Sequence, residues 1–467
     1  MGSKWKTVRL GDYCIKIGSG ATPKGGNSVY TDTGNTYFIR SQNVYNHGFN
    51  TNGLVFITDE AAFKLKNVDV QENDVLLNIT GDSVARVCIA PGAFLPARVN
   101  QHVAIIRPKN DAFDPRFLRY FLSSPHQQTL LLTLASAGAT RNALTKGMIE
   151  DLQVPKPPLH AQKSIANVLD SFDKKIESNN KINQTLEQIS QTLFKSWFVD
   201  FDPVIDNALD AGNPIPEALQ SRAELRQKVR NSVDYKPLPA DVRALFPAEF
   251  EETEMGWVPK KWKNGNLSNV TKILSGFAFK SKDFGDNGKG VIKIKNITTA
   301  KTIDIGDTQK ISEFIAKDAN RFLLLDGDIL MAMTGATVGK FGVLTTKNNE
   351  EYYLNQRVAK FETENKAYLY CVLNQQSTDR FITNAAQGSA QPNISAKDIL
   401  STPLLIPSVE LINTFNDFIS HLFYRIIANT KANLNLTALR DTLLPKLISG
   451  ELSLEDLPDL VTQTEPA

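Results

Sequence analysis

Cysteines, histidines and long apolar runs are all scarce in this chain of 467 residues, and each scarcity excludes a class of protein. The three cysteines, Cys14, Cys88 and Cys371, lie far apart in sequence, whereas a secreted disulfide scaffold needs many. The five histidines are scattered as well, and no Cys/His spacing resembles a zinc site. No window reaches about 18 uncharged apolar residues, and the first residues lack the apolar segment of a signal peptide. We therefore expect a cytoplasmic protein with neither a metal site nor a membrane span.

Catalytic motifs are also missing. A methyltransferase needs a glycine-rich turn and an Asn/Asp-Pro-Pro-aromatic loop, but Asp202-Pro203-Val204 lacks the second proline and the aromatic residue, and it reads as a helix stop. The segment Gly335–Phe341 resembles a phosphate-binding loop only in part, because Phe341 stands where a magnesium-binding Ser or Thr is required. A tight turn between strands is expected there instead. The sequence thus predicts a protein that is not an enzyme and holds no cofactor of its own.

Charge is distributed in blocks along the chain. Residues 1–155 carry 16 lysines and arginines against 12 acidic residues, and residues 257–408 carry 20 against 14. Residues 202–256 carry 6 against 11, and they are rich in proline. Two weakly basic blocks on a neutral-to-acidic frame are compatible with two domains that bind a polyanion. Two ordinary globular domains would also fit this pattern.

The chain repeats itself at an offset of about 250 residues. From Gly138 and Gly388 onward the offset is 250 without a gap, and it keeps one register over about 60 residues, which chance does not explain. The two halves are therefore related, each with a variable globular part followed by a better matched tail. Matching segments include Trp5-Lys6 with Trp262-Lys263, Asp74–Gly81 with Asp328–Gly335, and Asn100-Gln101 with Asn355-Gln356.

Each tail predicts one long helix of about 40 residues, or roughly 60 Å. Apolar residues recur at alternating steps of four and three, which is a heptad seam, and each seam carries two central asparagines. Matching asparagine pairs predict that the two helices align their middles antiparallel, although the asparagines would face water if the helices splay there. The predicted seam positions are Ile176, Asn179, Asn183 and Leu186 in the first helix and Ile426, Asn429, Asn433 and Leu436 in the second.

The expected fold is of the α+β class. Two mixed α/β domains are expected to form a pseudo-twofold repeat, joined by two long helices packed as an antiparallel coiled coil. The expected boundaries are a first domain at residues 1–155, a central helix at 156–201, a connector at 202–256 with some helix at 217–231, a second domain at 257–408, a C-terminal helix at 409–450 and an acidic tail at 451–467.

Polar residues that suit DNA recur at the ends of predicted strands in both halves. Arg, Asn and Gln pair bidentately with base edges, Lys binds phosphate or guanine, and a Thr-Gly turn offers a hydroxyl and an N–H to phosphate. Each could instead be a satisfied turn residue, and the repeat-variable loops Gly18–Tyr30, Tyr45–Asn52, Ala139–Asn142 and Phe277–Lys289 are equally good candidates. The candidate DNA-binding residues are Arg40, Gln42, Asn43, Thr80, Gly81, Asn100, Gln101 and Arg141 in the first half and Lys293, Lys295, Asn296, Thr334, Gly335, Asn355, Gln356 and Arg357 in the second.

Several stretches resemble the specificity subunits of type I restriction-modification enzymes, and the resemblance covers nearly the whole chain. They are Trp5–Asp12, Asp74–Gly81, Val154–Leu159, Leu193–Pro203, Phe246–Phe250, Met255–Pro259 and Leu443–Gly450. One departure is visible after the proline-rich entry to the first helix, where members usually carry Glu-Gln and this chain has Ala161-Gln162.

The resemblance implies a non-catalytic DNA-binding subunit that reads a bipartite target in double-stranded DNA with one domain per half-site. It implies two modification subunits as partners, which carry S-adenosylmethionine and methylate adenine, and optionally two restriction subunits that cleave DNA. Removing one heptad from both helices should then bring the readers about 10 Å closer, or about three base pairs. Two alternatives remain open, an enzyme with two recognition domains and a non-catalytic assembly scaffold or adaptor of a defence complex.

Overall fold

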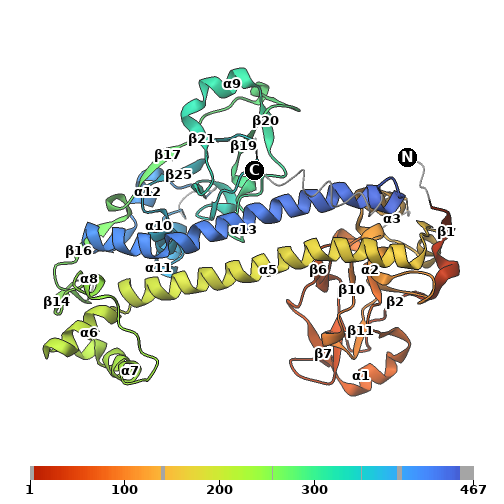
Figure 1. Cartoon of the computed structure of the whole chain (residues 1–467), viewed down its shortest axis with the longest axis horizontal. Coiled ribbons are helices and arrows are strands. Elements are labelled where there is room, and N and C mark those ends of the chain that lie inside the picture. The colour runs from red at the N-terminus through yellow and green to blue at the C-terminus, as the bar shows by residue number, and fades with distance from the viewer. Residues whose placement is uncertain (1–4, 138–141, 255, 349, 387–391, 453–467) are drawn as a thin grey trace. The chain divides into compact units, whose positions relative to one another are not determined.

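The computed structural model describes residues 5–137, 142–254, 256–348, 350–386 and 392–452. It divides into a first unit, residues 1–176 with 436–467, and a second unit, residues 177–435. Each unit combines strands with short helices and one stretch of each of two long helices (Figure 1). The α+β class expected from the sequence is confirmed.

Two sheets form the body of the first unit. A four-stranded antiparallel sheet has the order β10-β9-β12-β2, and a five-stranded mixed sheet has the order β3-β7-β4-β11-β8. Successive residues of β9 point to opposite faces, so Leu77 joins one apolar cluster and Leu76 another, and the four-stranded sheet is covered on both sides. The strands are β2 (Cys14–Ser19), β3 (Tyr30–Thr31), β4 (Thr36–Ile39), β7 (Val55–Ile57), β8 (Asp69–Val70), β9 (Val75–Asn78), β10 (Val87–Ile89), β11 (Ala97–Val99) and β12 (Val103–Pro108).

Short elements complete the first unit. Strand β1 (Thr7–Arg9) pairs with β13 (Gln153–Pro155), and β5 (Val44–Tyr45) forms a hairpin with β6 (Gly48–Phe49). Helix α2 begins with proline after the N-cap Asp114, whose carboxylate accepts two backbone N–H groups. The helices are α1 (Asp59–Lys64), α2 (Pro115–Ser123), α3 (Pro125–Ser136) and α4 (Lys146–Glu150).

The second unit repeats this topology. Its four-stranded sheet has the order β17-β25-β22-β23, and its five-stranded sheet has the order β18-β20-β19-β24-β21. The expected turn at 335–341 is confirmed, because it joins β22 to its antiparallel neighbour β23. The strands are β16 (Lys263–Asn266), β17 (Lys272–Ser275), β18 (Phe284–Gly285), β19 (Lys289–Ile292), β20 (Gln309–Ile311), β21 (Leu323–Leu324), β22 (Ile329–Ala332), β23 (Phe341–Val343), β24 (Tyr352–Leu354), β25 (Val358–Glu362) and β26 (Pro403–Ile406), and the helices are α9 (Glu313–Asp318), α10 (Lys366–Leu373), α11 (Gln376–Ala385) and α12 (Ala396–Leu400).

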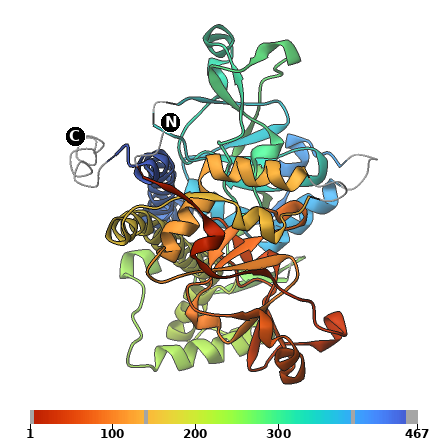
Figure 2. The same ribbon diagram turned by 90° about the vertical axis from the view of Figure 1, so that its right-hand side faces the viewer.

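The two long helices are α5 (Leu159–Phe198) and α13 (Val409–Ser449). Within each unit a stretch of α5 lies beside a stretch of α13 (Figure 2). In the second unit the amide of Asn179 donates to Asn433 and that of Asn429 donates to Asn183, each at 2.8 Å. Because rising numbers on one helix meet falling numbers on the other, the helices run antiparallel. All eight predicted seam residues are buried or half-buried.

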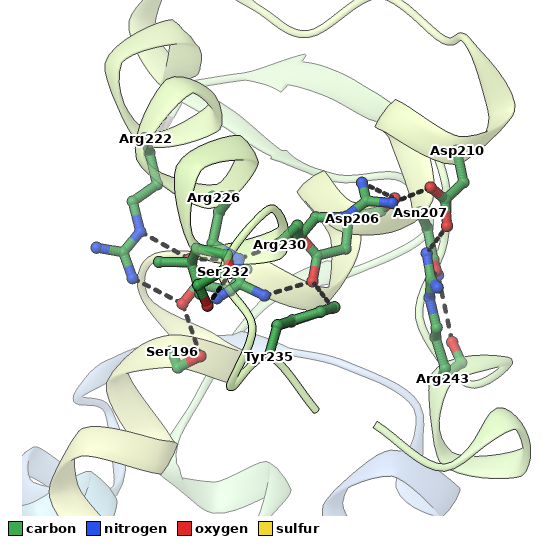
Figure 3. Close-up of polar contacts among 12 residues, drawn as sticks. Ser196, Asp206, Asn207, Asp210, Arg222, Arg226, Arg230, Ser232, Tyr235 and Arg243 are labelled. Carbon is green, nitrogen blue, oxygen red and sulfur yellow. Dashed lines mark hydrogen bonds and ion pairs between the residues drawn. The ribbon is translucent and has the colours of Figure 1, made fainter. Parts of the chain in front are cut away.

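The connector contains more helix than the sequence predicts. The chain turns at Phe201, whose φ of 56° is left-handed, and Pro203 then lies in the first turn of a new helix, α6. The helix stop expected at Asp202-Pro203-Val204 is therefore wrong, because α5 has already ended at Phe198 and a proline is favoured in the first turn of the helix that follows. An ion-pair ladder joins the next two helices, because Asp202, Asp206 and Asp210 on α6 bind Arg222, Arg226 and Arg230 on α7 (Figure 3). The elements are α6 (Asp202–Ala211), α7 (Gln220–Arg230), α8 (Ala240–Arg243), β14 (Phe250–Thr253) and β15 (Gly256–Pro259).

Candidate nucleic-acid interface

In the first unit three candidate segments meet at strand ends. The backbone N–H of Asn100 donates to the carbonyl of Ile39 at 3.0 Å, which joins the segment after β11 to the end of β4. The side chain of Asn78, at the end of β9, donates to the carbonyl of Ser41 at 2.8 Å, and the hydroxyl of Thr80 lies 2.5 Å from His102 Nδ1. The structure therefore brings residues 40–43, 78–81 and 100–102 together at one edge.

The residue after β2 packs so closely against the end of β11 that it must be a glycine. A side chain at Gly20, which follows β2, would place its Cβ only 2.1 Å from the carbonyl oxygen of Val99. Gly276 occupies the corresponding place in the second unit, where a Cβ would lie 2.3 Å from the carbonyl oxygen of Asn355. Only glycine fits at either position.

In the second unit the same three segments meet. The N–H of Asn355 donates to the carbonyl of Ile292 at 3.2 Å, and the N–H of Met333 donates to the carbonyl of Arg357 at 3.0 Å. The candidate residues of 293–296, 334–335 and 355–357 therefore share one edge, as their counterparts do in the first unit. The remaining candidate, Arg141, lies outside the described residues.

Two of the candidate asparagines hold the turns and offer nothing to DNA. Asn43 is fully buried; its Oδ1 accepts the N–H of Arg40, and its Nδ2 donates to the carbonyls of Asn50 and Asn52. Asn296 makes the same bonds, with Lys293 as donor and two carbonyls as acceptors. An asparagine that is buried and bonded at both ends has no atom left for a base edge, so the expectation of DNA contact is corrected at these two positions.

The Thr-Gly turns also use their polar groups internally. Thr80 is engaged with His102, and the N–H of Gly335 donates to the carbonyl of Pro392 at 2.9 Å. Both glycines have positive φ, 73° at Gly81 and 79° at Gly335, which closes the turn after β9 and β22. These internal hydrogen bonds occupy the hydroxyl of Thr80 and the N–H of Gly335, the groups that the sequence suggested for phosphate binding.

Of the ten remaining candidates five present polar groups to solvent, whereas Asn100 and Asn355 are buried and Arg40, Lys293 and Thr334 are half-buried. Gln42, Gln101, Lys295, Gln356 and Arg357 are exposed at these edges. Amide and guanidinium groups of this kind can pair with base edges in the major groove. Side chains of this kind are therefore exposed at the edge of each unit.

One cation at the edge of the second unit forms only a weak, exposed ion pair. Lys295 binds Asp307 at 2.8 Å, but both side chains are about half or more exposed. Exposed ion pairs contribute little to stability, so a phosphate can replace the carboxylate.

Two other cations at the edges lie against aromatic rings. Burial, followed by the charge of Lys295, lowers the pKa of the Lys293 amine, which lies 3.7 Å from the Phe284 ring centroid. In the first unit the Arg40 guanidinium lies over the ring of Tyr30. An aromatic face orients each of these two cations.

Neither a metal centre nor a membrane span is found in the part of the chain that the structure describes. Across these residues no group of three or more His, Cys, Asp or Glu side chains is placed to hold a metal ion. None of the helices within the described ranges has the length and hydrophobicity needed to cross a bilayer.

Comparisons with known proteins point to one family. A family model described as Type I restriction modification DNA specificity domain matches residues 2–188 and 259–436. The HindI specificity subunit of Haemophilus influenzae is 26% identical over 470 residues, which cover 96% of this chain and 100% of that protein. The MjaIX specificity subunit of Methanocaldococcus jannaschii is 25% identical over 366 residues, which cover 78% of this chain and 74% of that protein.

One solved structure shares the fold. The S subunit of a type I restriction-modification system from M. genitalium superposes with a TM-score of 0.53 at 16% identity, covering 95% of this chain and 96% of that one. At this identity the likeness concerns the fold. The two segments that the family model matches contain one sheet-rich half each.

Proposed function

This chain belongs to the family of type I restriction-modification DNA specificity domains, and we propose that it is the non-catalytic subunit that reads a bipartite DNA target for such a complex. Each half-site is read by one unit, at the edge where its strand-end loops meet. The observation that carries the proposal is the recurrence of that edge in both repeats, each with exposed amide or cationic side chains. The target-recognition domains are residues 1–155 and 257–408, with helices at 156–201 and 409–450, a connector at 202–256 and a tail at 451–467.

Two weakly basic reading domains bind DNA more tightly when they are linked in one chain. Once one half-site is bound, the second reader is held at a high effective concentration near its own half-site. Specificity then needs only modest discrimination per unit, because each mismatched base pair costs about 1–3 kcal/mol and the two half-sites add. A weak net charge on each reader keeps the sequence-independent phosphate contribution small.

The chemistry belongs to partner chains in this proposal. Two modification subunits bind S-adenosylmethionine and methylate adenine, and two restriction subunits are optional partners that cleave DNA. This chain determines which DNA sequence the partner subunits act on. It works in the cytoplasm and holds neither cofactor nor metal.

The proposal is tested in cells that express this chain with its cognate modification subunit and otherwise lack adenine methylation. Sequencing of N6-methyladenine is expected to give one split motif, two short defined blocks around a fixed gap. Methylation of a continuous motif, or none despite a soluble complex, would overturn the proposal in favour of an assembly scaffold.

A further inference from the structure

In the first unit, the hairpin that leaves the candidate reading loop is tied to the long helix α5 by a carboxylate. The buried Asn43 precedes β5, and its side chain holds two backbone carbonyls beyond β6, so the loop is the base of the β5–β6 hairpin. At the tip, the carbonyl of Asn46 accepts a hydrogen bond from the guanidinium of Arg119 on α2. The same guanidinium binds Asp173 on α5 at 2.9 Å. Loop, hairpin and helix are thus connected by hydrogen bonds.

Asp173 is the centre of this connection. Besides Arg119 it accepts the hydroxyl of Tyr120 at 2.8 Å and the guanidinium of Arg440, on α13, at 2.7 Å. Although burial opposes ionisation, the charges and hydrogen bonds of Arg119, Arg440 and Tyr120 hold the pKa of Asp173 below its ordinary value. The carboxylate is therefore charged at neutral pH and binds one element of the recognition domain and one of the helix pair at once.

The second unit makes the same connection with different parts. Asn296 again closes the loop, and the turn from Thr298 to Thr302 again forms the tip. Lys301, at that tip, donates to Glu187 of α5 at 3.3 Å, and the hydroxyl of Tyr370 donates to the same carboxylate oxygen at 2.9 Å. In the first unit a cation of α2 that binds the tip, and in the second unit a cation at the tip itself, thus meets an acid of α5 together with a tyrosine of the adjacent helix.

The acids are not repeat equivalents. At the offset of 250 residues, which holds from Gly138 and Gly388 onward, Asp173 corresponds to Phe423. Phe423 is buried in the apolar cluster of the second unit, so an apolar residue suffices there to pack the domain on its helices. Packing of the domain on its helices does not need the carboxylate. Both units nevertheless connect the hairpin or turn to an acid of α5, and they use different positions of α5 to do so. This recurrence indicates that the connection itself is required.

We propose that Asp173 and Glu187 are positioning residues for DNA reading, each holding the hairpin of one unit's reading loop at a fixed place on α5. This inference rests on the proposed function. A hairpin with strands of two residues is marginal by itself and needs an external anchor. Side chains that discriminate bases must be held within about 0.5 Å of the productive geometry, which a free hairpin does not achieve.

The test compares Asp173→Asn and Glu187→Gln in the full chain with its modification subunit, by the methylation readout described above. Each variant keeps the shape of the side chain and removes the charge. Methylation at sites with one mismatch, relative to perfect sites, is expected to rise about fivefold in one half-site only. Asp173→Asn relaxes one half-site and Glu187→Gln relaxes the other, while the gap stays constant.

Two further variants separate positioning from folding. Glu177→Gln removes an exposed α5 acid whose ion pair is with Lys181, and it is expected to leave both half-sites unchanged. Exchanging the charges in Lys301→Glu with Glu187→Lys is expected to restore the discrimination lost in Glu187→Gln. Unchanged discrimination in both single variants, or equal relaxation of both half-sites, would overturn the inference. A wild-type chain that gives no split motif would instead overturn the proposed function.

Discussion

Arg357 is one of two exposed cations among the candidate reading residues of the second unit. It is exposed, and its carbonyl is already fixed by Met333, so its backbone is held while its side chain is presented to solvent. Arg357→Ala is expected to weaken binding to a cognate duplex by about 1–3 kcal/mol, the usual contribution of a bidentate base contact. Fluorescence anisotropy at fixed salt measures the loss.

A matched variant shows whether the loss is specific to the edge. Lys263→Ala removes one exposed positive charge from β16 of the same unit, a strand that pairs with β26 and does not belong to either large sheet. We expect its affinity to change by less than that of Arg357→Ala. Equal losses in both variants would mean that net charge alone governs binding.

Asn43 and Gln42 are neighbours with opposite expected roles. Asn43→Ala removes three hydrogen bonds of a fully buried side chain and leaves one backbone N–H and two carbonyls without their partner, so we expect the free energy of unfolding to fall by about 2–4 kcal/mol. Gln42→Ala is expected to stay within about 0.5 kcal/mol of the wild type, because the side chain is exposed. Denaturant titration of the full chain measures both, and the opposite order would contradict the assignment.

These two neighbours also show where sequence reasoning stops. Repetition of the Asn in both halves indicated that the position matters, but an amide that closes a turn and an amide that reads a base have the same chemistry. Burial distinguishes them, and burial depends on the path of the chain from 50 to 52, which no local pattern encodes. Asp173 and Glu187 were missed for a related reason, since the repeat offset pairs Asp173 with an apolar residue, Phe423.

At the scale of elements, the ladder between α6 and α7 gives a graded prediction. Asp206 is 5% exposed and binds Arg226 and Tyr235, whereas the Asp210 side chain is 45% exposed. Asp206→Ala leaves a guanidinium largely buried without its partner and is expected to destabilise the α6–α7 pair by about 3 kcal/mol. Asp210→Ala is expected to cost at most about 1 kcal/mol.

Hydrogen exchange of the amides of α6 and α7 measures this difference locally, because the two helices can open without global unfolding. Equal protection in the two variants would show that the ladder acts as a unit and not as separate pairs.

The contribution of Asp210 to stability depends on pH. Arg230 and then Arg243 lower the pKa of Asp210 in the folded chain. The contribution is therefore fully present above the pKa of the unfolded chain and is lost as the pH falls through the pKa of the folded chain.

The long helices were the elements best predicted from sequence, because a heptad seam is a periodic signal that survives variation of single residues. Helix α6 was not predicted, since Pro203 reads equally as the end of one helix and the first turn of another. The left-handed Phe201 that separates the two helices has no sequence signature of its own.

For the whole molecule, the two readers are joined by helices whose length can be changed without altering either reading edge. Asn179 faces Asn433 and Asn183 faces Asn429, so residues 177–183 of α5 and 429–435 of α13 are opposite heptads. Duplicating both segments adds seven residues to each helix, or about 10 Å. If the helices set the distance between the readers, the gap in the methylated motif is expected to grow by about three base pairs while both half-sites keep their sequences.

Duplicating only one of the two heptads supplies the control. Seven extra residues in one helix leave its seam without a partner, and the asparagine pairs can then form only if the other helix is interrupted. We therefore expect the single duplication to lose methylation and the double duplication to retain it at the longer gap. A double duplication that methylates the original motif with its gap unchanged would mean that something other than α5 and α13 spaces the readers.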